Sequence, residues 1–489
     1  MTASEAFERF LAFEKRTGVG RREVCGVRVW PLVRFPVYSN LILPAVIPMG
    51  HPHPDMKMGS SRKGGFFQKF LRRVSALLWR LRYGPSCARD KCDILFSLTP
   101  REMTLPDGRR VSQLLDFFLS DLHPAYAVLE GRGPGDSYPP RSWRRVLHLD
   151  GYRGRFEAHR RQLRKKAAVA VRAFAEECAA GLAAEFGVPV DVEPLFQRLC
   201  AGMAFRSYYY PLFRQWLRRL QVKCVVTVVN YASVNLVLGE AAHDEGIPVV
   251  ELQHGTVYPA HAAYNLPDRD TAHSPDYLFA WGQHWAEQTR NYALRKTICT
   301  GYPMMEWMRC HYPVKEGGDI RKIVFISQGT IGGALSRYAV DLARRLSRDR
   351  YAVVYKLHPN ESKSWRTLYP WLDTGEVEVV SSAERSIYEL FGEAYATAGV
   401  YSTAVIEGLM WGVRAYVFAD LPGGDTMTPF LSAGLLEKVS SAADLATRLQ
   451  SADAVGRKER IDGSRFWESG SALRIASALE EIVKNGELK

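Results

Sequence analysis

Two histidines follow stretches that have the pattern of buried β-strands, and both residues are suited to chemistry. The first, His254, follows residues 247–252 in the sequence Gln253-His254-Gly255-Thr256, where the glycine permits a sharp turn. A histidine at a strand end can take a proton from a hydroxyl group, because its pKa lies near neutral pH. Glu251 can orient this imidazole or act as the base itself. The alternative is a histidine that makes only structural hydrogen bonds in the turn.

The second histidine, His358, follows residues 351–356 in the sequence Lys356-Leu357-His358-Pro359. Lys356 and His358 are two residues apart, so they share a face if the strand continues to His358. A proline lacks an N–H group and therefore ends the strand. A cationic side chain at this place can counter the charge of a leaving phosphate.

Two more strand ends carry hydroxyl groups and glycines. Ser327-Gln328-Gly329-Thr330 follows residues 322–326, and Ser402-Thr403 follows residues 395–398 and precedes a predicted helix. A short loop between a strand and a helix can present N–H groups to a phosphate. The loop that begins at Ser327 matches neither the P-loop nor the dinucleotide-binding fingerprint. Glycines in such turns also serve steric needs, and a hydroxyl group before a helix also serves as its N-cap.

The elements that position these residues alternate between strand and helix from Cys92 onward. Residues 222–229, 232–245 and 247–252 read as strand, helix and strand, which predicts a parallel sheet. The polar, glycine-containing segment 310–321 separates a first α/β series from a second. Strands are predicted at 93–98, 145–149, 222–229, 247–252, 277–280, 297–300, 322–326, 351–356, 377–380, 395–398 and 414–418, and the segment 26–34 also alternates like a strand. Helices are predicted at 6–16, 66–82, 155–186, 232–245, 336–347, 386–391, 403–411 and 472–484.

The predicted fold class is α/β, with two Rossmann-like doubly wound domains facing a cleft. In such sheets ligands bind beyond the carboxyl ends of the strands, which is where the histidines and hydroxyl groups stand. The predicted divisions are an N-terminal extension (1–90), a first domain for the acceptor (91–312), a second domain for the donor (313–465) and a C-terminal helix that packs back on the N-terminal half (466–489).

Composition excludes several classes of protein. The chain has 489 residues, of which 47% are hydrophobic and 24% charged, as in ordinary globular proteins. No apolar run approaches the ~20 residues of a membrane-spanning helix, and the N-terminus lacks a signal-peptide pattern, so we expect a cytoplasmic protein. The eight cysteines form no Cys-x-x-Cys pair, which argues against a zinc cluster or a redox pair.

The net charge of +13 favours anionic partners. No acidic residue stands between Asp55 and Asp90, and residues 66–82 there combine an apolar face with five cations. This segment is either an ordinary helix of the core or an interfacial helix on the anionic inner face of the plasma membrane. No zinc-finger, RNP or helix-turn-helix pattern is present, so we expect no nucleic-acid partner.

The C-terminal half resembles the donor domain of GT-B glycosyltransferases that build bacterial surface polysaccharides such as capsule and lipopolysaccharide. The resemblance rests on Lys-Leu-His-Pro at 356–359, the Ser402-Thr403 pair and the segment Glu407-Gly-Leu-Met-Trp-Gly412. In the N-terminal half, Glu-Leu-Gln-His-Gly-Thr at 251–256, Pro-Asp-Tyr-Leu-Phe-Ala-Trp-Gly at 275–282 and Gly-Tyr-Pro at 301–303 are similar to capsule, lipopolysaccharide and teichoic-acid transferases. The likeness covers about residues 220–420.

This resemblance implies a metal-independent glycosyltransferase without a cofactor. It would move a sugar from a nucleotide-activated donor, with CMP-Kdo or CMP-sialic acid favoured, to a growing surface polysaccharide or a lipid-linked acceptor. The alternatives are a CDP-glycerol-type polyol-phosphate transferase, a 2-epimerase-like enzyme and a non-catalytic capsule-assembly protein. The base is His254, Glu251 or Asp93, and the stereochemistry stays open. The donor site is expected to contain Ser327, Gln328, Gly329, Thr330, Lys356, His358, Pro359, Ser402, Thr403 and Glu407.

Overall fold

The chain folds into two compact units, each built on a parallel sheet. A computed structural model describes residues 1–47, 91–98, 102–105, 107–130, 146–315, 319–454 and 463–488. Unit 1 contains Met1–Ile47, the described residues up to Pro303, and the chain from Glu468 onward; unit 2 contains Met304–Trp467. The polypeptide passes from unit 1 to unit 2 at the start of helix α9 (Pro303–His311).

The sheet of unit 1 has seven strands in the order β5-β4-β1-β6-β7-β8-β9, and its neighbouring strands pair in parallel. The chain builds outward from β1 through β4 to β5, then returns to the other side of β1 to continue from β6 to β9. This order is that of a doubly wound sheet, as predicted. The strands are β1 (Ile94–Leu98), β4 (Tyr126–Glu130), β5 (Val146–His148), β6 (Cys224–Val228), β7 (Val249–Leu252), β8 (Tyr277–Ala280) and β9 (Lys296–Cys299). A separate antiparallel pair joins β2 (Glu102–Thr104) to β3 (Arg110–Ser112).

Alternation along the strands divides the apolar residues of unit 1 between two faces of the sheet. Leu95, Val225 and Val249 belong to a large core shared with the helices α1, α2, α5, α6 and α7. Phe96, one residue further along β1, instead contacts the rings of Phe118 and Tyr126. The helices of this unit are α1 (Ala3–Thr17), α2 (Trp30–Val37), α3 (Leu43–Val46), α5 (Arg153–Phe186), α6 (Val192–Leu220), α7 (Ser233–Asp244), α8 (Gln283–Glu287) and α16 (Ser471–Asn485).

The first helix illustrates how local sequence sets an element's ends. Thr2 and Glu5 form a capping box at the start of α1, and Gly18 adopts the left-handed conformation at its end. The helix buries Phe7, Phe10 and other apolar residues in the core of unit 1. The described part of the N-terminal segment, residues 1–47, therefore contributes directly to this core.

The strand-like interpretation of residues 26–34 is wrong from Trp30 onward, because helix α2 begins there. Pro31 occupies the first turn, where a helix needs no N–H group from it. Trp30, Val33 and Val37 recur at helical spacing and are buried. The indole of Trp30 also donates a hydrogen bond to Oε1 of Glu14 at 2.7 Å, which ties α2 to α1.

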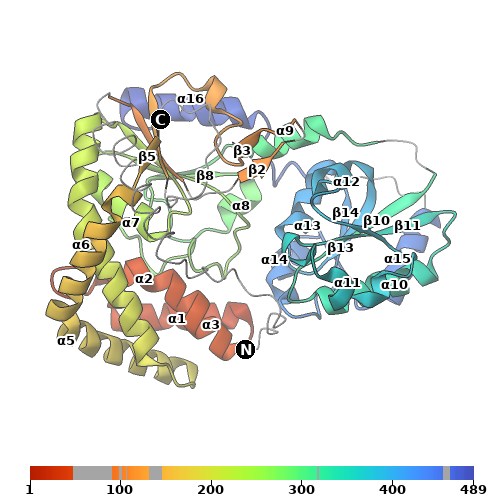
Figure 1. The fold of residues 1–489 in the computed structure, drawn as a ribbon, viewed down its shortest axis with the longest axis horizontal. Coiled ribbons are helices and arrows are strands. Elements are labelled where there is room, and N and C mark those ends of the chain that lie inside the picture. Colours follow the sequence, from red (N-terminus) through yellow and green to blue (C-terminus); the bar gives the residue numbers. More distant parts are fainter. Residues whose placement is uncertain are drawn as a thin grey trace, which may run out of the picture. The chain divides into compact units, whose positions relative to one another are not determined.

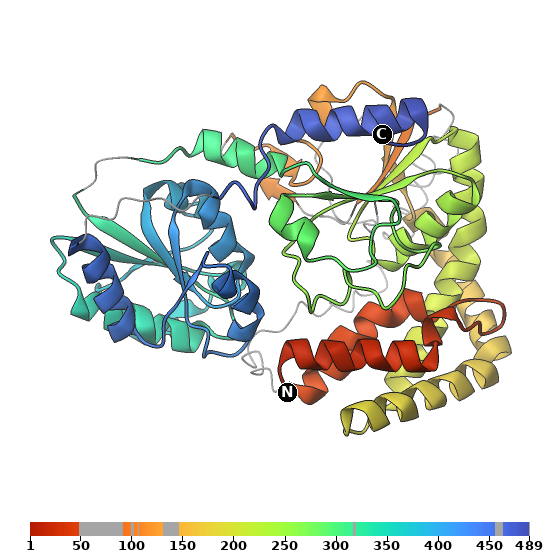
Figure 2. The ribbon, with the colours of Figure 1, turned by 180° about the vertical axis from the view of Figure 1, so that it is seen from behind.

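Long helices and the chain's end complete unit 1. Helices α5 and α6 pack side by side along one flank of this unit (Figure 1). The C-terminal helix α16, the blue helix in Figure 2, contacts the short 3-10 segment Leu119–Asp121, far from it in sequence. Glu480 of α16 accepts a hydrogen bond from the backbone N–H of His123 at 3.2 Å. Helix α6 and strand β4 were not anticipated from the sequence.

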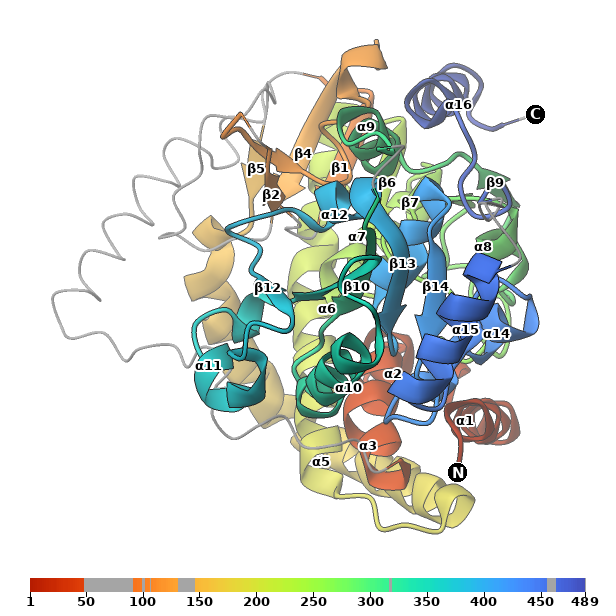
Figure 3. The ribbon, with the colours of Figure 1, turned by 90° about the vertical axis from the view of Figure 1, so that its right-hand side faces the viewer.

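The sheet of unit 2 has six strands in the order β12-β11-β10-β13-β14-β15, again with parallel neighbours. Figure 3 shows β13 and β14 side by side in this sheet. The strands are β10 (Arg321–Ile326), β11 (Tyr351–Lys356), β12 (Glu378–Val380), β13 (Ala394–Gly399), β14 (Arg414–Val417) and β15 (Glu437–Lys438). The helices include α10 (Gly332–Arg345), α11 (Trp365–Leu368), α12 (Ile387–Glu393), α13 (Thr403–Glu407), α14 (Thr428–Ser432) and α15 (Ala442–Ala454).

The predicted helix 403–411 is two elements in the structure. The α-helical turn α13 ends at Glu407, and a 3-10 segment, Gly408–Trp411, continues to Gly412, which adopts the left-handed conformation. The predicted interfacial helix 66–82 lies outside the described residues. Among the helices that the structure describes, none combines the length and the apolar character that crossing a membrane requires.

Candidate functional site

The topology of unit 2 brings two of the predicted donor-site segments together. From β10 the chain moves to β11 and β12 on one side, then returns to β13 on the other side of β10. The carboxyl ends of β10 and β13 therefore flank the point where the strand order reverses, which is where doubly wound sheets bind ligands. Ser327-Gln328-Gly329-Thr330 follows β10, and Tyr401-Ser402 follows β13.

Direct contacts join these two loops. The side-chain Oε1 of Gln328 accepts a hydrogen bond from the backbone N–H of Tyr401 at 3.3 Å. The hydroxyl groups of Thr330 and Tyr401 are also hydrogen-bonded. Thr330 is exposed and Gln328 is half-buried. The loop after β10 is thus held in a fixed place while part of its polar surface stays open to a ligand.

A buried carboxylate, Glu361, organises the neighbouring loop after β11. Glu361 is fully buried and accepts hydrogen bonds from the Ser327 hydroxyl at 3.0 Å, the Tyr369 hydroxyl at 2.6 Å and the backbone N–H of His358 at 2.8 Å. These bonds connect the loops after β10 and β11. The sequence offered a signal, because His358 and Glu361 have the spacing of a capping box.

The same turn defines how His358 presents its imidazole. Its Nδ1 accepts a hydrogen bond from the backbone N–H of Asn360 at 3.3 Å, and Pro359 begins the short 3-10 segment Pro359–Glu361. A neutral imidazole that accepts at Nδ1 carries its proton on Nε2. His358 is half-buried, so its Nε2–H is available as a donor toward an anionic ligand at this edge of the sheet.

Lys356 has a different environment from the one expected from the sequence. Its side chain is buried, and its Nζ donates to the backbone carbonyl of Arg385, just before α12, at 2.5 Å. Burial lowers the pKa of Lys356 to about 8. The Lys356 amino group is therefore held by the backbone before α12, whether or not a ligand is bound.

The remaining donor-site residues have structural roles that the sequence left open. The Ser402 hydroxyl accepts from the backbone N–H of Ala404 at 3.3 Å and caps α13, whose first residue is Thr403 and whose last is Glu407. A Cβ on Gly332 would lie 2.1 Å from the Tyr369 hydroxyl oxygen, so any larger residue at this position would clash with Tyr369. A Cβ on Gly333 would meet no atom within 4 Å, which leaves the start of α10 open.

In unit 1, the predicted base residues form a buried cluster at the carboxyl end of β7. Glu251 follows Val249 by two residues and so extends the row of side chains that faces the helices. It is fully buried, and its Oε1 accepts hydrogen bonds from the backbone N–H of Asn230 at 3.1 Å and the Tyr264 hydroxyl at 3.2 Å. Burial raises the pKa of Glu251 to about 8.

His254 lies between two tyrosine hydroxyl groups. Its Nε2 is 3.0 Å from the hydroxyl oxygen of Tyr231, and its Nδ1 is 3.0 Å from that of Tyr264. Nδ1 is also 3.6 Å from Oε1 of Glu251. The residue is only 4% exposed. Within unit 1, both nitrogens of its imidazole therefore contact tyrosine hydroxyl groups and not solvent. The structure thus brings His254 and Glu251 close together.

The third base candidate, Asp93, is separated from this cluster. Asp93 precedes β1, at the amino end of that strand, whereas His254 follows the carboxyl end of β7. Its carboxylate pairs with Lys223 at 2.9 Å and accepts from the backbone N–H of Ala125 at 3.1 Å. Because the strands are parallel, these two ends lie at opposite edges of the sheet, and Asp93 serves the local structure there.

A pocket of about 320 Å³ borders the cluster within unit 1. Asn230 and Tyr231, which follow β6, form part of its wall, and Phe35 of α2 contacts the Tyr231 ring with centroids 4.4 Å apart. Strand β6 lies beside β1 where the strand order of this sheet reverses, so the pocket also adjoins a switch point. Ion pairs on the wall join Arg34 to Glu14 at 2.7 Å and Arg28 to Asp270 at 3.1 Å.

Comparisons with known proteins give fold-level similarity at low sequence identity. No protein-family model matches the sequence, and no curated protein matches it. Among solved structures, the UDP-GlcNAc 2-epimerase from Methanocaldococcus jannaschii superposes with a TM-score of 0.47 at 11% identity, covering 79% of this chain and 99% of the epimerase. The wall teichoic acid polymerase TagF superposes with a TM-score of 0.46 at 13% identity, covering 86% of this chain and 98% of the polymerase. These TM-scores are too low to carry either activity over to this chain.

Proposed function

We propose that this protein is a GT-B-type glycosyltransferase that takes a sugar from a nucleotide-activated donor. The observation that carries the proposal is the reversal point in the sheet of unit 2. There, the loop 327–330, in which Thr330 is exposed, is fixed against Tyr401 and connected to the turn that holds His358. Together they offer hydroxyl groups, backbone N–H groups and an imidazole donor, which are the groups that bind phosphate oxygens.

The donor in this proposal is a CMP-sugar such as CMP-Kdo or CMP-sialic acid. His358 donates from Nε2 to a phosphate oxygen, and Thr330 and Gln328 contact the phosphate or the sugar. Lys356, buried at the end of β11, adds positive charge near these groups. With these groups in place the reaction needs no metal ion. A CDP-glycerol-type donor fits the same phosphate-binding groups and is the alternative.

The acceptor side of the proposal is the pocket in unit 1. Its wall carries the aromatic ring of Phe35, the amide of Asn230 and the hydroxyl-bearing Tyr231, a mixture suited to a saccharide. His254 and Glu251 lie directly behind this wall and supply the base. The acceptor is the growing end of a surface polysaccharide or of a lipid-linked glycan. Attachment to the inner face of the plasma membrane through residues 66–82 stays a prediction.

A thermal-shift screen tests the donor half of the proposal. CMP, CDP, UDP and GDP are each added to the wild-type protein and to His358→Ala, with Lys363→Ala as an exposed control on the same loop. A nucleotide at about 100 times its Kd should stabilise the wild type by ~2.7 kcal/mol. We expect CMP to give the largest shift, His358→Ala to lose it and Lys363→Ala to keep it.

The outcomes separate the candidates. A dominant shift with CDP, and transfer from CDP-glycerol, would favour the polyol-phosphate alternative. Nucleotide binding followed by transfer from CMP-Kdo or CMP-sialic acid to an oligosaccharide would support the proposal. If none of the four nucleotides stabilises the protein, the donor site proposed for unit 2 is wrong.

A further inference from the structure

The hydrogen bonds around His254 have a direction that can be deduced from the chemistry of each group. Oε1 of Glu251 accepts from both Asn230 and Tyr264. Tyr264 has a single hydroxyl proton, and since it is directed to Glu251, the Tyr264 oxygen is left as an acceptor. The contact of 3.0 Å between that oxygen and His254 therefore requires a proton on Nδ1 of the imidazole.

The other ring nitrogen follows from this assignment. A neutral imidazole with its proton on Nδ1 has a lone pair on Nε2. The Tyr231 hydroxyl, 3.0 Å away, therefore donates its proton to Nε2. The four groups form one chain of donors, from Tyr231 through His254 and Tyr264 to Glu251, and every proton in it is directed inward.

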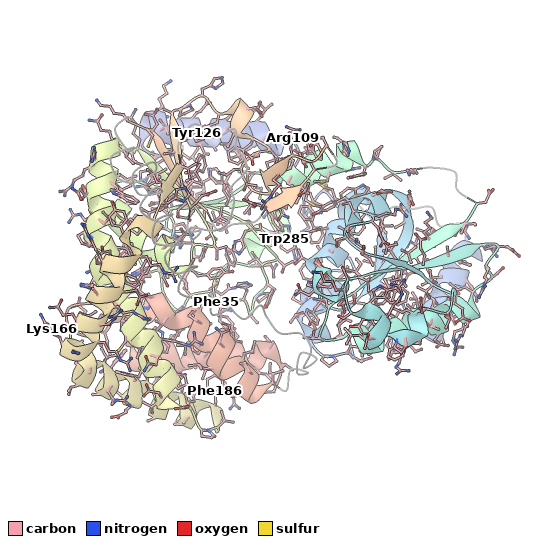
Figure 4. All side chains as sticks on the ribbon, viewed as in Figure 1. Phe35, Arg109, Tyr126, Lys166, Phe186 and Trp285 are labelled. Carbon is pink, nitrogen blue, oxygen red and sulfur yellow. The ribbon has the colours of Figure 1, made fainter. Side chains whose placement is uncertain are left out.

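Only the outer end of this hydrogen-bond chain, Tyr231, reaches the pocket. Of its four members, Tyr231 is the one that lines the pocket wall, and it is half-buried. His254, Tyr264 and Glu251 are each at most 4% exposed. Phe35 of α2, labelled in Figure 4, packs on the Tyr231 ring of the loop after β6.

A competing base beside the chain is excluded by its surroundings. The ring of His261 lies 6.2 Å from that of Tyr231 and 5.1 Å from that of Tyr264, between centroids. Burial and the neighbouring His254 lower the pKa of His261 to about 3. His261 therefore stays neutral and does not take up protons in the physiological range.

We propose that Tyr231 receives the proton of the acceptor hydroxyl group and hands its own proton to His254. This inference rests on the proposed function. In the transfer step the acceptor O–H bond breaks and its proton moves to the Tyr231 oxygen while the Tyr231 proton moves to Nε2 of His254. The acceptor oxygen uses the freed electron pair to bond to the donor sugar's anomeric carbon. The bond from that carbon to the phosphate oxygen breaks, and the nucleotide leaves with the electron pair.

The inner members of the chain stabilise the product of this step. Once Nε2 is protonated, the imidazolium still donates from Nδ1 to Tyr264, which donates to Glu251. Oε1 of Glu251 also lies 3.6 Å from Nδ1, so the two groups are held close together. Tyr264 and Glu251 are positioning residues in this scheme, because they act on the substrate only through His254.

The test compares Tyr231→Phe with Tyr210→Phe. Both substitutions remove one hydroxyl group, and the hydroxyl of Tyr210 is hydrogen-bonded to Asp244 outside the pocket. Transfer from the nucleotide-sugar found in the screen is measured as a function of pH. We expect Tyr231→Phe to lower kcat by about 100-fold or more, to lose the acid limb of the wild-type pH profile and to keep the nucleotide-induced thermal shift. Tyr210→Phe should match the wild type in all three.

Each outcome decides between the two claims. If the wild type transfers sugar and Tyr231→Phe does so at the same rate with the same pH profile, the relay is wrong and the proposed function stands. If the wild type transfers no sugar from any donor, both claims fall. A second readout, the ¹⁵N chemical shifts of His254, should show a proton on Nδ1 in the wild type; a proton on Nε2 instead would overturn the assigned direction.

Discussion

The two sheets of this protein end in contrasting ways at their carboxyl edges. In unit 1 the polar residues at the end of β7 are buried: His254 and Glu251 are at most 4% exposed and are hydrogen-bonded to tyrosines. In unit 2 the corresponding loops leave Thr330 exposed and His358 half-buried. A desolvated chain of hydrogen bonds suits the movement of a proton, whereas an open polar loop suits the binding of a hydrated anion.

Under the proposed function, the two units have separate tasks. Substitutions in the buried chain of unit 1 should change the rate of proton transfer with little effect on nucleotide affinity. Substitutions in the open loops of unit 2 should change how the donor phosphates are held. The following experiments test that division, in order of decreasing effect.

His254→Gln should have the largest effect on turnover. Glutamine keeps a polar group between Tyr231 and Tyr264 but cannot take up a proton, so kcat should fall by about 100- to 10,000-fold with nucleotide affinity unchanged. Steady-state kinetics and the nucleotide-induced thermal shift measure the two quantities. Should activity survive His254→Gln and disappear in Glu251→Gln, the carboxylate is the base.

His358→Ala should reduce transfer by about 100-fold, or about 3 kcal/mol, because it removes a donor to the developing charge on the leaving phosphate. Unlike His254→Gln, it should also weaken nucleotide binding. Isothermal titration with the nucleotide and kinetics with the full donor check both effects. Near wild-type turnover in a folded variant would remove His358 from the site.

Glu251 should make stability depend on pH in a specific direction. Its pKa is raised by burial from the ordinary value of 4.5 to about 8, so the folded state holds a proton that the unfolded state releases. The free energy of unfolding should therefore decrease as pH rises from about 4.5 to about 8, and Glu251→Gln should remove that decrease. Urea unfolding of both proteins at several pH values gives the difference, in which the opposite contribution of His261 cancels. Parallel curves for the two proteins would contradict the raised pKa.

Ser402→Ala should have the smallest effect. Its hydroxyl caps α13, so the loss should cost about 1 kcal/mol of stability. Adding Thr403→Ala tests whether these hydroxyl groups also contact the donor. A loss of stability with unchanged nucleotide affinity would restrict Ser402 and Thr403 to capping; a weakened affinity would place them in the donor site.

Much of the framework was predictable from local sequence. Most strands of the two parallel sheets were predicted with small shifts at their ends, because parallel strands covered on both faces are continuous apolar runs. Helix α2 was missed, because its few residues alternate as in a strand and Pro31 suggested a break. Strand β4 and helix α6 were missed as well; α6 carries Pro211 in its interior, which weakens a helical pattern.

The sequence by itself determined most strands of the two parallel sheets and placed His254 and His358 directly after buried strands. Those features depend on neighbours along the chain: apolar runs, glycine turns and the proline after His358. Only the tertiary structure decided which groups these histidines meet. Tyr231 reaches His254 from 23 residues away and Tyr264 from 10, and Lys356 bonds to the carbonyl of Arg385, 29 residues away. Such partners are set by which strands lie side by side and by the need to pair every buried polar group, and neither is encoded in local spacing.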